Sequence, residues 1–241
     1  MRTMNLIKDN WQNKDINLFQ EYLISLKNKD EKKIEWTRNI VNTNLPVLAI
    51  PSKDLKKIAK EILKGNYLSF LEKAKFTYHE NTIIYAYIIN EIKDYTIQIK
   101  YLEYYSKIID NWASCDALKL KIKNCEEKYL NLAKAYLNSK LCFQRRIGII
   151  FLFSLLDKDN YLDEIFKILD SLYEEKEYYV NMAAAWLLCE CVIKHRKKTY
   201  EYLENHHLNK FIINKAISKC RDSYRISEED KNYLLKFKII I

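Results

Sequence analysis

The chain has 241 residues, of which 49% are hydrophobic, so it is long enough and apolar enough to bury a substantial core. Its 41 lysines and arginines against 32 aspartates and glutamates give a net charge of +9, which favours an anionic partner such as nucleic acid. No stretch reaches the roughly 18 consecutive apolar residues of a membrane span, and the amino-terminal segment lacks the features of a signal peptide, so we expect a cytoplasmic protein.

Glycine and proline are scarce, with only Gly65, Gly148, Pro46 and Pro51 in the whole chain. Nucleotide-binding loops need clustered glycines, so we expect no nucleotide cofactor. The cysteines and histidines show neither the CxxC nor the HExxH spacing, so we expect no metal, and in a chain of this kind we expect reduced thiols. The lack of turn-forming residues predicts an all-α fold.

Apolar residues recur at three- and four-residue spacing, as in "LKKIAKEILKG" at 55–65. In chain order this spacing predicts helices at 15–28, 31–42, 52–64, 67–76, 80–93, 95–109, 112–122, 125–138, 141–156, 160–173, 177–194, 198–205, 208–221 and 227–237. Short connections make successive helices antiparallel neighbours, and about seven such pairs in a row favour a solenoid of helical hairpins over a closed bundle. Composition does not change along the chain, so we expect one domain over residues 1–241.

The predicted helix at 112–122 carries an indole and an acid in the stretch "DNWASCDAL" at 110–118. Trp112 and Asp116 are four residues apart, so they share a face of the helix. A buried acid is costly unless it has a partner or a function. The simpler interpretation is that Trp112 belongs to the core and that Asp116 bonds a neighbouring lysine or a helix end.

Two later helices contain further candidates. The apolar stretch "CFQRRIGIIFLFSLL" at 142–156 begins with Arg145 and Arg146, and "YYVNMAAAWLLCECVIKH" at 178–195 carries Trp186 after three alanines. Small residues let neighbouring helices approach closely and would leave the indole protruding. Taken alone, each feature is ordinary, because an arginine at a helix start is usually solvated and a tryptophan near alanines is usually core.

Taken in order, these features resemble the DNA alkylation repair family, the AlkD-like alkylpurine DNA glycosylases built from HEAT-like repeats. The matching features are the Trp-x-x-x-Asp pair, the arginine at the head of an apolar helix, and "AAAWLL". The stretch "LPVLAIPSKDLKKIAKEI" at 45–62 resembles the family's amino-terminal signature, and "NKAISKCRDSYRIS" at 214–227 resembles its carboxyl-terminal one. The resemblance covers most of the chain and implies a right-handed solenoid with a concave DNA-binding groove.

The resemblance also implies roles for individual residues. Asp116 would be the catalytic carboxylate, and Trp112 and Trp186 would pack against the deoxyribose of the damaged nucleotide. One arginine of the pair Arg145 and Arg146 would hold the phosphate backbone. The position before "IGII" favours Arg146, although the register could slip by one residue.

The chemistry of base release fits these residue types. Hydrolysis of an N-glycosidic bond passes through an oxocarbenium-like state, which a carboxylate and aromatic faces stabilise. Ordinary glycoside cleavage also uses a second carboxyl group as proton donor, and these motifs contain none. A base alkylated at a ring nitrogen is already cationic and needs no proton to leave. The resemblance therefore implies a monofunctional glycosylase that removes 3-methyladenine or 7-methylguanine from duplex DNA in base excision repair.

Basic residues outnumber acidic ones toward the carboxyl end. We expect DNA phosphates to be bound there and at the arginine pair, by residues that include Arg145, Lys194, Lys215, Lys219, Arg221 and Arg225. Such binding would depend on salt and ignore base sequence, whereas a solvated lysine-rich end is the alternative. We expect a monomer with no membrane partner, located in the bacterial cytoplasm and associated with the nucleoid when bound to DNA. Two alternatives stay open for the whole chain: a DNA-binding helical repeat without catalysis, and a protein-interaction scaffold.

Overall fold

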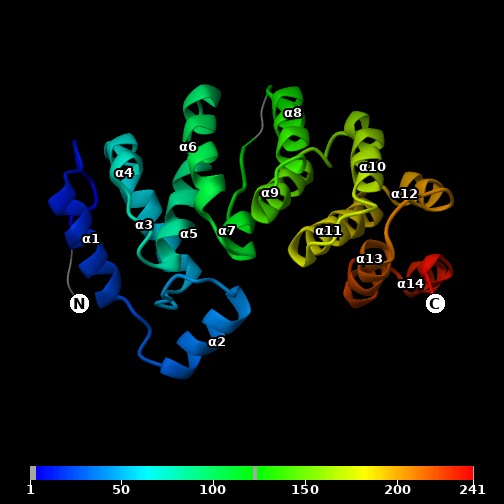
Figure 1. Ribbon diagram of the computed structural model, residues 1–241, viewed down its shortest axis with the longest axis horizontal. Coiled ribbons are helices and arrows are strands. Elements are labelled where there is room, and N and C mark those ends of the chain that lie inside the picture. Colours follow the sequence, from blue (N-terminus) through cyan, green and yellow to red (C-terminus); the bar gives the residue numbers. More distant parts are fainter. Residues whose placement is uncertain (1–3, 122–123, 241) are drawn as a thin grey trace. The chain divides into compact units, whose positions relative to one another are not determined.

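The computed structural model describes residues 4–121 and 124–240, and over these ranges it is helical without strands (Figure 1). The chain divides into two compact units, Met1–Lys121 (unit 1) and Ile122–Ile241 (unit 2), which we describe separately. The predicted all-α class is therefore confirmed. That both units belong to one domain stays a prediction.

In unit 1, helix α5 is buried among its neighbours. It packs against α3, α6 and α7, while α1 packs against α4. The described helices of this unit are α1 (Asn13–Ser25), α2 (Glu31–Val41), α3 (Ser52–Ile62), α4 (Tyr67–Lys73), α5 (His79–Ile89), α6 (Tyr95–Ile108) and α7 (Trp112–Asp116).

Unit 2 contains a row of packed helices in which α8 contacts α9, α9 contacts α11, and α11 contacts α13 (Figure 1). Short 3-10 helices precede α10, at Asp159–Tyr161, and follow α14, at Leu235–Phe237. The α-helices described in this unit are α8 (Glu126–Leu137), α9 (Cys142–Phe153), α10 (Leu162–Ser171), α11 (Tyr178–Lys194), α12 (Arg196–Leu203), α13 (Lys210–Asp222) and α14 (Glu228–Leu234).

One contact in each unit joins two helices that are one hairpin apart in the chain. In unit 1, the Thr82 and Ser114 hydroxyls lie 2.7 Å apart, and the two residues are 32 positions apart in sequence. In unit 2, Arg146 Nη1 donates to the Tyr179 carbonyl at 2.6 Å over a separation of 33 positions. Contacts between equivalent helices one hairpin apart are what a helical-repeat solenoid produces. The right-handed turn and the concave groove stay predictions.

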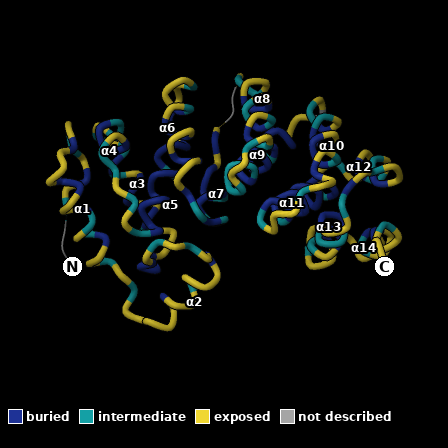
Figure 2. The backbone as a smooth tube through the Cα atoms, in the orientation of Figure 1, coloured by how far each residue is buried: buried dark blue, intermediate teal, exposed yellow. Residues whose placement is uncertain are grey.

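Helices α5 and α11 are buried on nearly every side, as the dark blue stretches in Figure 2 show. Their sequences are correspondingly apolar around the whole circumference, with "IIYAYII" in α5 and "AAAWLLCECVI" in α11. Ala183, Ala184 and Ala185 are fully buried, so the alanines do let neighbouring helices approach α11 closely.

All fourteen predicted helices have a counterpart, and the largest departure concerns the one predicted at 112–122. Helix α7 ends at Asp116 instead, and residue 122 lies outside the described residues. The cause is the side chain of Asn90, which donates to the Ala117 carbonyl at 2.9 Å and accepts from the Lys119 N–H at 2.8 Å. These two backbone groups are therefore unavailable for continuing the helix.

None of the helices in the described part of the chain combines the length and the apolar composition that crossing a bilayer requires.

The core of unit 1 contains an aromatic cluster around Trp11. Trp11 contacts Phe70 and Phe19, with ring centres 4.9 and 5.9 Å apart, in edge-to-face geometry.

Gly148 allows α8 and α9 to approach closely. A Cβ atom added at this position would lie 2.8 Å from the Ala133 carbonyl oxygen of α8. We expect Gly148→Ala to lower the free energy of unfolding by about 1–3 kcal/mol, because the two backbones must separate. The measurement is urea unfolding, with Asn131→Ala on the exposed side of α8 as the control. A Gly148→Ala variant as stable as this control would contradict the close packing.

Candidate active site

Trp112 and Asp116 lie at opposite ends of the short helix α7, one turn apart. Asn111 caps the helix, because its side chain accepts the Ser114 N–H at 2.9 Å. Both Trp112 and Asp116 are half-exposed and line the same cavity, so Asp116 is not the buried core acid that its sequence context suggested. The Trp112 Nε1–H group donates to the Ile40 carbonyl of α2 at 2.9 Å. The indole is therefore fixed in orientation.

Hydroxyl groups link helix α7 to α5 and α6. The Ser114 hydroxyl contacts that of Thr82 on α5, and the Tyr105 hydroxyl donates to the Ser114 carbonyl at 2.9 Å. The Tyr105 ring is fully buried and stacks on Tyr85 with ring centres 5.7 Å apart. Burial raises the pKa of Tyr105 well above its usual value, so its hydroxyl stays a proton donor.

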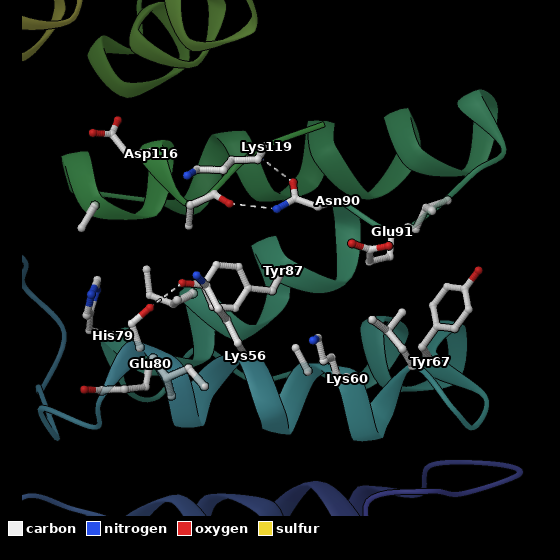
Figure 3. A pocket seen from close by; sticks show the side chains of 18 of the residues that line it. Lys56, Lys60, Tyr67, His79, Glu80, Tyr87, Asn90, Glu91, Asp116 and Lys119 are labelled. Carbon is white, nitrogen blue, oxygen red and sulfur yellow. Dashed lines mark hydrogen bonds between the residues drawn. The ribbon is translucent and has the colours of Figure 1, made fainter. Parts of the chain in front are cut away.

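The cavity beside α7 has a volume of about 1410 Å³ and lies entirely within unit 1. Figure 3 shows Asp116 and His79 toward one end, and Tyr67 and Glu91 toward the other. Its walls come mainly from α3, α5, α7 and the segments that follow α5 and α7, and Thr37 of α2, Tyr67 of α4 and Ile97 of α6 complete the lining. A space of this size is open enough for part of a large ligand to enter.

Five lysines that the sequence analysis did not single out line this cavity: Lys56, Lys60, Lys93, Lys119 and Lys121. Lys56 and Lys60 lie on α3 and Lys119 follows α7, on the opposite wall in Figure 3. Lys56 Nζ lies 5.8 Å from the ring centre of Tyr87. Within the described residues, the Lys60 and Lys119 ammonium groups form no ion pair. The four-residue spacing of Lys56 and Lys60 on the polar side of an amphipathic helix was the available signal.

Glu80 fixes the wall segment that precedes α3. Its carboxylate accepts the Leu48 N–H at 3.1 Å and the Ile50 N–H at 3.4 Å. Between them, Ala49 has a positive φ of 53°, which curls the backbone around the carboxylate. Burial raises the pKa of Glu80, and the backbone N–H groups oppose this rise. The "LPVLAIP" stretch is thus a backbone cradle for a buried acid.

His79 lies beside Glu80 and is only 6% exposed. Its Nδ1 atom has no hydrogen-bond partner among the described residues. Burial lowers the pKa of His79 to about 4, against a smaller opposing effect from the Asp110 carboxylate. The imidazole is therefore neutral at pH 7.

In unit 2, α9 and α11 carry the other two residues assigned to catalysis. Trp186 is half-buried against Phe153, with ring centres 4.4 Å apart, so it protrudes less than its alanine neighbours suggested. Arg146 is 5% exposed and donates to the Tyr179 carbonyl, two turns before Trp186 on α11. The structure thus brings Trp112 and Asp116 together in unit 1, and it places Arg146 and Trp186 on contacting helices of unit 2.

The neighbouring arginine has a different environment. Arg145 forms a two-pronged ion pair with Glu175, at 2.7 and 3.1 Å, and donates to the Ser139 carbonyl at 2.9 Å. Burial alone would raise the pKa of Glu175, but hydrogen bonds, chiefly from Arg145, lower it overall. Arg145 therefore fastens the start of α9 to the segment before α11.

The predicted DNA-binding residues of the carboxyl-terminal region fall into two groups. Lys194 pairs with Asp157 at 2.6 Å, and Arg225 forms an ion pair with Glu190. The remaining three lie on α13, which packs against α11, and form no ion pair within the part of unit 2 that the structure describes: Lys215, Lys219 and Arg221.

The buried neutral His79 makes stability depend on pH. In the unfolded chain a histidine binds a proton below about pH 6.5, whereas folded His79 does so only near pH 4, so stability falls as pH decreases between these values. We expect a loss of roughly 3 kcal/mol across this window in urea unfolding. His79→Gln should flatten the profile, and His207→Gln, at an exposed position, should not. Parallel profiles for the native protein and His79→Gln would contradict this.

Comparison with known proteins identifies the family. The model of the family described as DNA alkylation repair enzyme matches residues 22–220, from α1 to α13. No curated protein matches the chain. The matched range contains all the predicted site residues except Arg221 and Arg225, and it supports an enzymatic role in DNA repair with DNA as the partner. The chain therefore belongs to the DNA alkylation repair enzyme family.

Proposed function

We propose that this protein is a monofunctional DNA glycosylase that hydrolyses the N-glycosidic bond of cationic alkylated purines in duplex DNA. The observation that carries the proposal is the placement of Trp112 and Asp116 one turn apart on the wall of an open cavity. The family membership adds the substrate, alkylated DNA. The substrates expected from the resemblance are 3-methyladenine and 7-methylguanine.

Asp116 acts on the sugar in this proposal. As the glycosidic bond breaks, positive charge develops at C1′ of the deoxyribose, and a nearby carboxylate stabilises it and orients the attacking water. The Trp112 ring, fixed by its hydrogen bond to Ile40, offers a flat negative face to the same charge. Both groups are half-exposed, so a sugar can reach them.

The other carboxylates around the cavity have different tasks. Glu80 is occupied by backbone N–H groups, Glu91 pairs with Lys121 at 2.5 Å, and Asp94 caps α6 by accepting the Ile97 N–H. None of these three is placed as a proton donor to a leaving base. A neutral purine would have to leave as an anion, whereas a purine alkylated at a ring nitrogen leaves neutral. This supports cationic lesions as the substrate class.

The lysines of the cavity supply phosphate contacts on either side of the sugar. Lys56 and Lys60 form one wall and Lys119 the other, with no acid paired to Lys60 or Lys119 in the described residues. Ammonium groups in such positions bind phosphate without reading base sequence. Damage is thus recognised through the sugar and the base charge, which suits an enzyme that must act at any sequence.

Unit 2 contributes the second indole and the arginine. We propose Arg146 for the backbone-holding role, as the resemblance implies. Its guanidinium is buried and donates to the Tyr179 carbonyl at 2.6 Å, so a phosphate contact requires this bond to open, as the contacts of Arg145 with Glu175 and Ser139 also would. Trp186 would pack against the deoxyribose, supported by Phe153. The α13 cations Lys215, Lys219 and Arg221 would extend the phosphate contacts along the duplex, and Lys194 and Arg225 only if their ion pairs open.

Replacement of the catalytic carboxylate is the direct test. We expect Asp116→Asn to lower the rate of methylated-base release from alkylated duplex DNA at least about 100-fold, because the amide cannot neutralise the developing cation. Duplex affinity should change little. The assay is release of 3-methyladenine and 7-methylguanine under single-turnover conditions. Glu91→Gln, which alters another cavity carboxylate, is the control, and unchanged hydrolysis by Asp116→Asn would refute the assignment.

The tryptophans should act on turnover more than on binding. Removing either ring in Trp112→Ala or Trp186→Ala takes away a cation–π contribution of about 0.5–2 kcal/mol, a loss of roughly 2- to 30-fold in rate. Single-turnover rates and duplex affinities of each variant give the comparison, with Trp→Phe at the same positions restoring part of the rate. Equal losses in rate and affinity would mean that the indoles only bind DNA.

A further inference from the structure

Helix α2 exposes an indole that the proposed reaction does not use. Trp36 is 62% exposed and Ile40, one turn later, is 44% exposed. Ile34 and Val41 are the buried residues of this helix, and they pack it against the rest of unit 1. Tryptophan is highly buried on average in folded proteins, and here Trp36 and Ile40 are exposed together, so this pair is a candidate contact for a partner.

Two lysines of α2 lie apart from its other charged residues. At about 100° per residue, Lys32 and Lys33 flank Trp36 on the side away from the buried residues, whereas Glu31, Glu35 and Arg38 lie together on another side. Glu31 is paired with Lys27 at 2.8 Å. Among the described residues, the ammonium groups of Lys32 and Lys33 have no acidic partner. The outward face of α2, formed by Lys32, Lys33, Trp36 and Ile40, is therefore both apolar and cationic.

The helix that carries this face also borders the candidate active site. The Ile40 carbonyl accepts the Trp112 indole N–H, and Thr37 lines the cavity together with Trp112 and Asp116. The segment after α2 is tied to the turn before α7, since Thr43 Oγ1 and the Asn44 N–H both donate to Asp110 at 2.7 Å. A duplex that places a sugar at Asp116 has α2 beside it.

We propose that the outward face of α2 binds duplex DNA next to the lesion and weakens base stacking there. Trp36 and Ile40 are the apolar wedge against a base step, and Lys32 and Lys33 hold the flanking phosphates. Apolar side chains inserted at a base step separate the two stacked base pairs. Cations beside them neutralise the flanking phosphates. The inference rests on the proposed function, because it takes the lesion to be bound at Trp112 and Asp116.

Two features of the outward face of α2 favour a polyanion with planar apolar groups as its partner. An exposed indole stacks on bases of any identity, which matches an enzyme acting at every sequence. Two unpaired lysines one turn before the wedge complement phosphates, whereas burial against an apolar protein face would desolvate both charges without a partner. Duplex DNA satisfies the ring and the lysines together.

The test uses a duplex with a non-cleavable abasic-site analogue and 2-aminopurine at the adjacent position, whose fluorescence rises when stacking is lost. The native protein should raise this signal, and Trp36→Ala should reduce both the rise and the rate of base release from alkylated DNA by about tenfold. Trp36→Phe should recover part of each. Leu18→Ala on α1, which removes a side chain that is 52% exposed, is the control and should change neither.

The outcomes separate the two proposals. If the native protein releases no methylated base, the proposed glycosylase function fails. If it does release base while Trp36→Ala matches the native protein in signal and rate, this inference alone is overturned. It is also overturned if Trp36→Ala changes the molar mass of the free protein in light scattering and leaves the DNA readouts intact, because the face would then join two copies of the chain.

Discussion

Helix α5 is buried on nearly every side, so its polar side chains are stabilised where they find a partner inside the protein. Glu80 and Thr82 have such partners, whereas the His79 Nδ1 atom and the Tyr85 hydroxyl have none among the described residues. Glu80 accepts backbone N–H groups of residues 48 and 50, and Thr82 contacts the Ser114 hydroxyl. Asn90, which directly follows the helix, binds backbone groups of residues 117 and 119. These contacts fix the walls of the cavity. The arrangement of the candidate active site is thus a result of satisfying the polar groups of one buried helix.

The same principle separates structural charges from those available to a ligand. Arg145, Lys194 and Arg225 are held by acids within unit 2, whereas Lys60 and Lys119 in unit 1 form no ion pair among the described residues. A net charge of +9 counts all of them equally. Under the proposed function, phosphates are bound by the cations that lack an acidic partner, which in unit 2 are Lys215, Lys219 and Arg221 on α13.

Much of the fold was predictable because helical spacing is a local property, and every predicted helix has a counterpart. The pairing of Trp112 with Asp116 was predictable for the same reason. The end of α7 was not, since it depends on Asn90, which is 27 positions from Ala117. Nor were the ion pair between Arg145 and Glu175, 30 positions apart, and the hydrogen bond from the buried Arg146 to the Tyr179 carbonyl, 33 positions away. Contacts between residues one repeat apart cannot be predicted from the apolar spacing within a single helix.

The early end of α7 has an electrostatic consequence. Because the helix stops at Asp116, the carboxylate stands among the last carbonyl groups, at the negative end of the helix dipole. The dipole and the carboxylate add to one negative spot that repels phosphate and attracts a cation. Under the proposed function, this spot sets the register of the duplex: the strand settles with its phosphates on the surrounding lysines, and the sugar between two phosphates comes to rest opposite Asp116.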